Sequence, residues 1–389
     1  MRKIYGILFC VFPLCAFAGP VLQMNSAFTS LSELIPYVTD EAKFTDKKNE
    51  AFVREKLSQL ARSIRNAKHD ALMKQDIFAP SYLLLKEQLD TTQKAFNEGK
   101  KGFALNRMKD LTSMCIDCHS RLPPEKLSSY SDGTFHLNPK NFGNSYNLAI
   151  GELLTRQYTK ARGSFQFSID ESFVSKDYAM TEKALKQILL IEIKIMKEDQ
   201  KMLAVLDGIA NRKDLPVYLK NQIQEWRSDV NTWAKRKDYR KELSDDKEAG
   251  QFIAGLETLL KPAKTVFGKG DVDLLAASGI LSRFLFNNPT TSLAPEINYW
   301  LGWMELRLGR DHYFSTGDFF LKQCIRRYSK NPIAMRCLSE LKNDLTFKFS
   351  GSSGTHIPED VVKELKDLEH LININEFMKK PEENEEEVE

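Results

Sequence analysis

Residues 104–120 read ALNRMKDLTSMCIDCHS. One face of this segment has the 4, 3, 4, 3 spacing of an α-helix, and its members are Ala104, Met108, Leu111, Cys115 and Cys118. His119 comes four residues after Cys115, so its ring lies near the same face. The segment therefore predicts a helix that directs two thiols and an imidazole toward the interior of a helical bundle.

Two amphipathic segments before it supply partner helices. The apolar face of the first consists of Phe52, Leu57, Leu60, Ala61 and Ile64. The face of the second consists of Tyr82, Leu85, Leu89, Thr92 and Phe96. Pro80 suits the first turn of that second helix and Gly99 suits its end. A shorter helix near residues 31–38 is the expected fourth member of the bundle.

The rest of the chain continues the helical pattern. Helical spacing recurs over residues 40–118 and 146–347, and we find no alternating strand pattern or hairpin. A stretch rich in Pro, Gly, Ser and Asn separates the two blocks. We therefore expect an all-α fold, divided into a bundle at 19–124, a linker at 125–145, a helical domain at 146–350, and a C-terminal helix with an acidic tail at 351–389.

The N-terminus has the pattern of an export signal. Arg2 and Lys3 precede an apolar run at residues 4–17, and Ala16-Phe17-Ala18 has the small-x-small form of a cleavage site. The run is too short to span a bilayer as a helix. We expect cleavage after Ala18, no transmembrane segment thereafter and a soluble periplasmic protein, with an uncleaved N-terminal anchor as the alternative.

The pentapeptide C-x-x-C-H at residues 115–119 is the signal for covalent attachment of c-type haem. Two thiols one helical turn apart reach the two vinyl groups, and the adjacent histidine reaches the iron. The motif occurs once, so we expect one haem c, attached through Cys115 and Cys118 with His119 as proximal iron ligand. A thioredoxin-like pair would need a βαβ context and a zinc site a fourth ligand, while a local disulfide gives His119 no role.

This helix order, with the motif near the end of the last helix, resembles the four-helix-bundle cytochromes c of the cytochrome c′ type over about residues 25–123. The resemblance implies a haem-carrying bundle. It also implies that the iron has either five or six ligands, because both kinds occur in that family. The side of the iron opposite His119 therefore decides the chemistry.

Ligands for that side should come from particular helix ends. In an up-down-up-down bundle the last helix ends beside the start of the first, the end of the second and the start of the third. His69 and Met24 are the first candidates, followed by Met73, and an open position is the alternative. On a regular helix His69 falls roughly 120° from the apolar face and Met73 farther round. Met114 is expected to point away from the iron, and His136 is a minor candidate.

The C-terminal block contains a repeated pattern. Arg283 followed by Asn288-Pro289 recurs as Arg326 followed by Asn331-Pro332. Residues 299–302, Tyr-Trp-Leu-Gly, hold an aromatic-Leu-Gly pattern. These features resemble tetratricopeptide repeats over about residues 275–345. The resemblance implies stacked helix pairs with a concave surface that docks a protein partner, and it assigns the tryptophans to packing.

Cys324 and Cys337 flank the turn near residue 330 almost symmetrically. In an antiparallel helix pair they would sit at similar heights, so an oxidising compartment would allow a disulfide between them. Two buried free thiols are the alternative.

These observations lead to three hypotheses about function. The first is an exported monohaem cytochrome c that transfers electrons, with the helical repeat domain docking a protein partner. The second is a haem-containing scaffold or small-ligand (gas) sensor in the cell envelope. The third, an enzyme such as a peroxidase, lacks support because Arg62, Arg65 and His69 share one helix. Nucleic-acid binding is not expected, since the net charge is only +3 and no basic stretch interleaves with aromatics.

Overall fold

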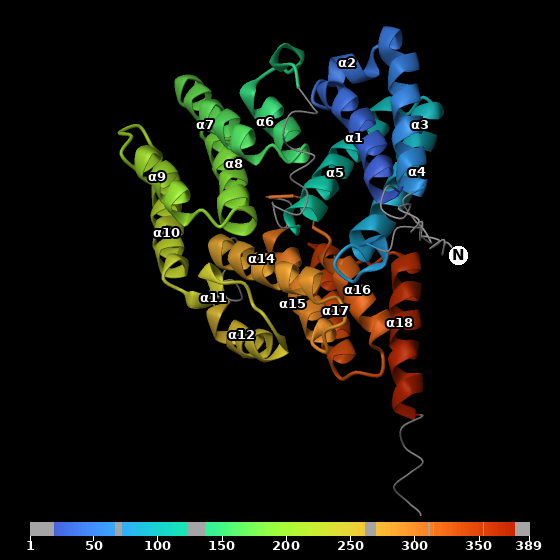
Figure 1. Ribbon diagram of the computed structural model, residues 1–389. Helices are drawn as coiled ribbons and strands as arrows, with labels where there is room; N and C mark the ends of the chain where they lie inside the picture. The colour runs from blue at the N-terminus through green and yellow to red at the C-terminus, as the bar shows by residue number, and fades with distance from the viewer. Residues whose placement is uncertain are drawn as a thin grey trace, which may run out of the picture.

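The computed structural model describes residues 19–66, 72–122, 137–260, 270–309, 312–313, 315–352 and 354–377, without the side chains of residues 19–25, 72 and 374–377. The expected all-α fold is confirmed, because the described chain is almost entirely helical (Figure 1). The expected signal peptide and the acidic tail lie outside the described residues.

The N-terminal bundle consists of α1 (Gly19–Val38), α3 (Glu50–Asn66), α4 (Ala79–Asn97) and α5 (Lys101–Ser120). Between α1 and α3 lie α2 (Glu41–Thr45) and the 3₁₀ turn η1 (Lys47–Asn49), and η3 (Leu72–Lys74) precedes α4. Helix α1 packs against α3, α3 against α4 and α4 against α5. Consecutive helices are therefore neighbours, as short connections in a bundle require.

The first helix is longer than its sequence pattern predicts. Its apolar side chains Ala27, Leu31, Leu34, Ile35 and Val38 are all buried. The prediction of a short helix at residues 31–38 was wrong, because polar residues obscure the pattern before Leu31 while packing on α3 maintains the helix from Gly19. The expected stop at Gly99 is present, since its φ of 79° suits a glycine between α4 and α5.

The C-terminal helices are α6 (Ser145–Leu154), α7 (Tyr158–Ser175), α8 (Tyr178–Leu189), α9 (Asp199–Ala210), α10 (Val217–Ala234), α11 (Lys237–Arg240), α12 (Asp246–Leu259), α14 (Asp271–Asn287), α15 (Ala294–Leu308), α16 (Gly317–Arg327), α17 (Ile333–Lys348) and α18 (Glu359–Phe377). A 3₁₀ turn, η5 (Pro139–Asn141), precedes α6, and a π-helical segment, η6 (Leu190–Ile195), continues α8. Pairs such as α6 with α7 and α15 with α16 pack side by side.

The two Asn-Pro dipeptides occupy equivalent turns. Asn288-Pro289 lies between α14 and α15, and Asn331-Pro332 lies between α16 and α17. Within the second hairpin, a disulfide joins Cys324 of α16 to Cys337 of α17. One short hairpin, β1 (Ser350–Gly351) with β2 (Gly354–Thr355), was not expected from the sequence, because strands of two residues are too short to alternate.

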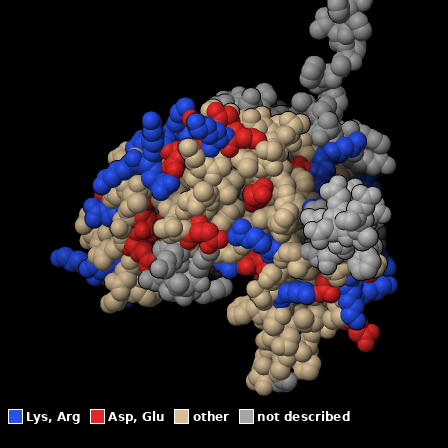
Figure 2. Space-filling view, turned by 90° about the horizontal axis from the view of Figure 1, so that it is seen from below, with Lys and Arg blue, Asp and Glu red and all other residues tan. Residues whose placement is uncertain are grey.

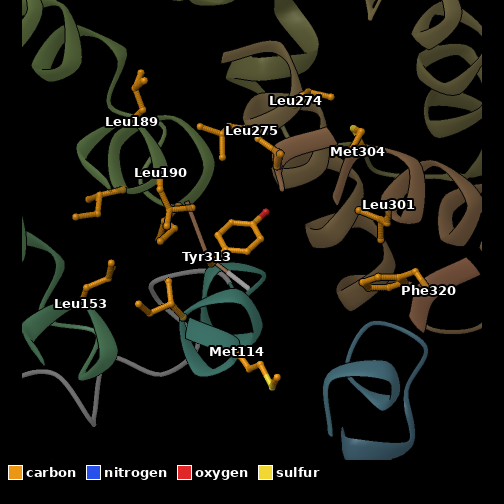
Figure 3. Packing of buried hydrophobic residues seen from close by; sticks show 14 of the residues in the cluster. Met114, Leu153, Leu189, Leu190, Leu274, Leu275, Leu301, Met304, Tyr313 and Phe320 are labelled. Carbon is orange, nitrogen blue, oxygen red and sulfur yellow. The ribbon is translucent and has the colours of Figure 1, made fainter. Parts of the chain in front are cut away.

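The bundle and the C-terminal helices share one hydrophobic core among the described residues. Helix α16 packs against α4, and the ring of Phe78 lies 6.0 Å from that of Phe286 in an edge-to-face arrangement. Figure 3 shows side chains from α5, α6, α8, α14, α15 and α16 meeting in this core, with Tyr313 among them. The end of α5 is therefore packed on both sides, by its own bundle and by the C-terminal helices.

No helix in the described ranges is long and apolar enough to cross a membrane. On the face turned to the viewer in Figure 2, Lys and Arg side chains are interspersed with Asp and Glu. That face carries no extended field of one sign.

Candidate cofactor site

A small apolar cavity lies among the four helices of the bundle, where the end of α3, the start of α4 and the end of α5 meet the middle of α1. Its volume is about 60 Å³. Its lining residues are Ala27, Phe28 and Leu31 of α1; Leu60 and Ile64 of α3; Met73; Ser81, Tyr82 and Leu85 of α4; and Met114, Cys115, Cys118 and His119 of α5. These are the middle of α1, the end of α3, the start of α4 and the end of α5. Three of the helix ends expected to meet in an up-down-up-down bundle therefore meet here, whereas α1 contributes its middle rather than its start.

Both cysteines of the motif are free, half-buried thiols. Burial, together with the neighbouring Cys118, raises the pKa of Cys115 to about 12. Burial likewise raises the pKa of Cys118 to about 11. Redox-active cysteine pairs work through a thiolate with a lowered pKa. The environment here does the opposite, which disfavours a thioredoxin-like function for this pair.

The imidazole of His119 is held by a helix end from the C-terminal region. Its Nδ1 lies 3.1 Å from the backbone carbonyl oxygen of Leu154, the last residue of α6. A carbonyl only accepts hydrogen bonds, so Nδ1 carries the proton and Nε2 keeps its lone pair. Burial, together with the nearby Arg156 cation, lowers the pKa of His119 to about 4. His119 is therefore a neutral imidazole whose Nε2 can bind a metal.

The second variable residue of the motif, Asp117, belongs to a buried polar network. Asp117 is 0% exposed and Arg121 only 1%. Their side chains form an ion pair, and Arg121 also donates to the hydroxyl oxygens of Ser81 at 2.8 Å and Thr316 at 2.7 Å. The Thr316 hydroxyl in turn donates to Asp117 Oδ2 at 3.0 Å. Residues from α4, α5 and the loop before α16 thus fix the end of the helix that carries the motif.

Neither His119's partner nor this network could be predicted from the sequence. The pair Asp117 and Arg121 shows the spacing of an ion pair along a helix, but such pairs are usually exposed. Leu154 contributes a backbone oxygen, which has no signature in the side-chain pattern.

Only some of the candidate sixth ligands lie in the part of the chain that the structure describes. His69 and His136 lie outside the described residues, and Met24 is on α1 without a described side chain. Met73 lines the cavity. This position is consistent with its place among the candidates, because α3 ends at Asn66 and Met73 lies on the separate turn η3 rather than farther round a continuous helix.

Met114 also lines the cavity, so the expectation that it points away was wrong. It precedes Cys118 by four residues and therefore shares its helix face. Figure 3 shows its side chain leaving α5 on the side away from Tyr313. The arginine side chains considered for peroxide chemistry do not line the cavity. Arg62 is exposed, and Arg65 pairs with Asp90 at 2.6 Å between Nη1 and Oδ1.

The chemical nature of these donor groups fits a covalently bound haem. Two thiols and a neutral imidazole share a wall of the cavity, and most other lining side chains are apolar. The volume of about 60 Å³ is well below the roughly 300–1,000 Å³ typical of cofactor sites. The helices around the cavity would have to separate to admit such a group. In the described ranges, no three His, Cys, Asp or Glu side chains are grouped as a metal site of the zinc type.

Comparison with known proteins finds no relative of this chain. The chain matches no protein family, no curated protein and no solved structure.

Proposed function

We propose that this chain is an exported monohaem c-type cytochrome that transfers electrons. Cys115 and Cys118 would attach one haem c covalently, and His119 would bind its iron. The observation that carries the proposal is the common wall of the cavity formed by these three side chains, together with the hydrogen bond that leaves His119 Nε2 its lone pair. The haem would supply one-electron redox chemistry, and the chain would supply ligands, burial and orientation.

The hydrogen bond from His119 Nδ1 to Leu154 has a defined part in this proposal. Iron-binding histidines commonly donate their second nitrogen to a carbonyl or carboxylate, which fixes the ring and increases its basicity. Here the acceptor is the end of α6, on the far side of the expected linker. The C-terminal region thus supports the proximal ligand directly.

The helical repeat region is proposed to dock a protein partner. Helix α7 leaves two apolar side chains on one face exposed, Phe167 at 61% and Val174 at 88%. Exposed apolar side chains that cluster on one face are typical of interaction sites. The periplasm is the proposed location, since haem c attachment and the Cys324–Cys337 disulfide both suit an exported protein.

A second candidate function, sensing of a small gas, rests on a different observation. Among the described residues that line the cavity, His119 is the only histidine. If no methionine binds the iron, its sixth position would be open to CO or NO, which favours sensing over electron transfer.

Optical spectroscopy of the purified holoprotein tests both candidates. A c-type spectrum after denaturation, with haem that stays with the chain, supports the cytochrome, and a chain without haem absorption contradicts both candidates. A low-spin spectrum that CO does not change favours electron transfer. A high-spin spectrum that CO shifts favours the sensor.

A further inference from the structure

A second, larger cleft lies on another side of α5. Its volume is about 840 Å³, and it is bounded by the ends of α1 and α6, the middle of α5, and α8, with His312 at its edge. Figure 1 shows α6 and α8 beside α5 at this place. The cleft shares no lining residue with the cavity around Cys115 and Cys118. Its size is within the range of about 300–1,000 Å³ that is typical of small-molecule sites.

One part of the cleft wall is apolar. The side chains that form it are Ile35, Val38, Ile116, Tyr146, Ile150, Leu154 and Met180. They come from four helices, so the wall depends on how the bundle and the C-terminal helices pack together. An apolar wall of this kind suits a ligand with a hydrocarbon or aromatic body.

The charged residues of the cleft are mainly positive. Lys109 of α5 and Lys183 of α8 are exposed, and neither has an ion-pair partner in the described part of the chain. Lys186 is paired with Glu182, the only acidic residue in the lining, at 2.9 Å between Nζ and Oε1. Two lysines on opposite sides of the cleft are thus available to an anion.

Two buried polar side chains, Gln187 and His312, are among the lining residues of the cleft. Gln187, 4% exposed, donates through Nε2 to the His312 carbonyl oxygen at 2.8 Å, and its Oε1 has no hydrogen-bond partner. His312, 2% exposed, donates through Nδ1 to the Lys186 carbonyl oxygen at 2.9 Å. Its Nε2 lies 3.8 Å from Asp271 Oδ2, beyond hydrogen-bonding distance. Gln187 Oε1 and His312 Nε2 are both closed to solvent, and His312 Nε2 faces Asp271, which does not line the cleft, so neither atom is presented as an acceptor to a molecule in the cleft.

We propose that this cleft binds a small organic anion with an apolar body. The apolar wall would contact the body, and Lys109 and Lys183 would attract the negative charge. The two sites share no lining residue, although Leu154 of the apolar wall also reaches His119 through its backbone carbonyl oxygen.

Isothermal titration calorimetry of the full chain with anilinonaphthalene sulfonate tests the proposal. This probe combines an aromatic body and one negative charge. We expect saturable binding at one site. The double variant Lys109→Gln/Lys183→Gln should weaken binding about fivefold to tenfold, since it removes both unpaired cations. The matched control Lys220→Gln/Lys247→Gln removes two exposed lysines outside the cleft and should leave the affinity unchanged.

Two further experiments distinguish specific binding in this cleft from nonspecific binding to apolar surface. The half-buried Ile150 lines the cleft, so the larger indole of Ile150→Trp should occupy part of it and weaken binding while circular dichroism shows the parent helix content. The same probe without its sulfonate should bind at least several-fold more weakly. Equal affinity of the parent and the lysine double variant, unchanged binding by a folded Ile150→Trp chain, or equal affinity for the uncharged probe would each overturn the proposal.

Discussion

The two cysteine pairs of this chain have the same chemistry and different surroundings. Cys115 and Cys118 lie one turn apart on α5, remain free and face an apolar cavity. Cys324 and Cys337, separated by 13 residues, lie on two antiparallel helices and form a disulfide in the core. A pair on one helix stays open to the cavity, whereas a pair across a hairpin closes on itself. Geometry, rather than the residue type, therefore leaves one pair free and joins the other in a disulfide.

The largest expected effect concerns the first pair. We expect Cys115→Ala/Cys118→Ala to lose covalent haem completely, because both thioether positions are removed. Mass spectrometry of the denatured chain measures this directly. The control Cys324→Ala/Cys337→Ala should retain the haem mass, and a double variant of the first pair that still carried haem would contradict the assignment.

The second-largest expected effect is a loss of stability when the contact between the N-terminal bundle and the C-terminal helices is removed. Arg121 at the end of α5 bonds to Thr316, the residue before α16. Replacing it by methionine leaves the Asp117 carboxylate buried without its cation, so we expect the free energy of unfolding to fall by about 3–5 kcal/mol. Urea denaturation measures the loss.

The control for Arg121→Met is Lys201→Met. Lys201 pairs with Glu198 at 3.0 Å, but the two side chains are 48% and 40% exposed, so a much smaller change is expected. Equal losses in the two variants would show that the buried network does not hold the regions together.

The disulfide should contribute somewhat less to the free energy of unfolding than Arg121 does. Closing a loop of this length stabilises a chain by roughly 3 kcal/mol, and Cys324→Ala/Cys337→Ala should lose about that amount. Reductant should lower the urea midpoint of the parent and leave that of the variant unchanged. Alkylation of both cysteines without reductant would instead mean that the two thiols are free.

The smallest expected change in stability comes from adding a methyl group to a glycine, tested once in the C-terminal helices and once in the N-terminal bundle. A Cβ atom on Gly317 of α16 would lie 2.7 Å from the Gly302 carbonyl oxygen and from the Leu306 backbone nitrogen. Gly317→Ala should therefore cost about 1–3 kcal/mol through overpacking. A Cβ on Gly102 of α5 meets nothing within 4 Å, so Gly102→Ala should be neutral or stabilise by up to about 1 kcal/mol. Thermal unfolding of both variants distinguishes the signs, and a stabilised Gly317→Ala chain would refute the close approach of α15 and α16.

Prediction from the sequence worked where the signal was local. The helix face from Ala104 to Cys118 and the stop at Gly99 follow from spacing and backbone preference along a short segment. Prediction failed for Met114, whose position depended on which flank of α5 the cavity touches. Whether Met73 reaches the cavity depended on where α3 ends, which helical spacing alone left open.

The sequence by itself determined the helical class, the C-x-x-C-H motif on its helix and the cysteines either side of one turn, since all three depend on residues close together in the chain. Only the tertiary structure decided the hydrogen bond that orients His119 and the burial of Asp117 with Arg121. Those contacts join residues 35 and 195 positions apart, from His119 to Leu154 and from Arg121 to Thr316. Periodicity describes which face of a helix is apolar, and packing alone selects what meets that face.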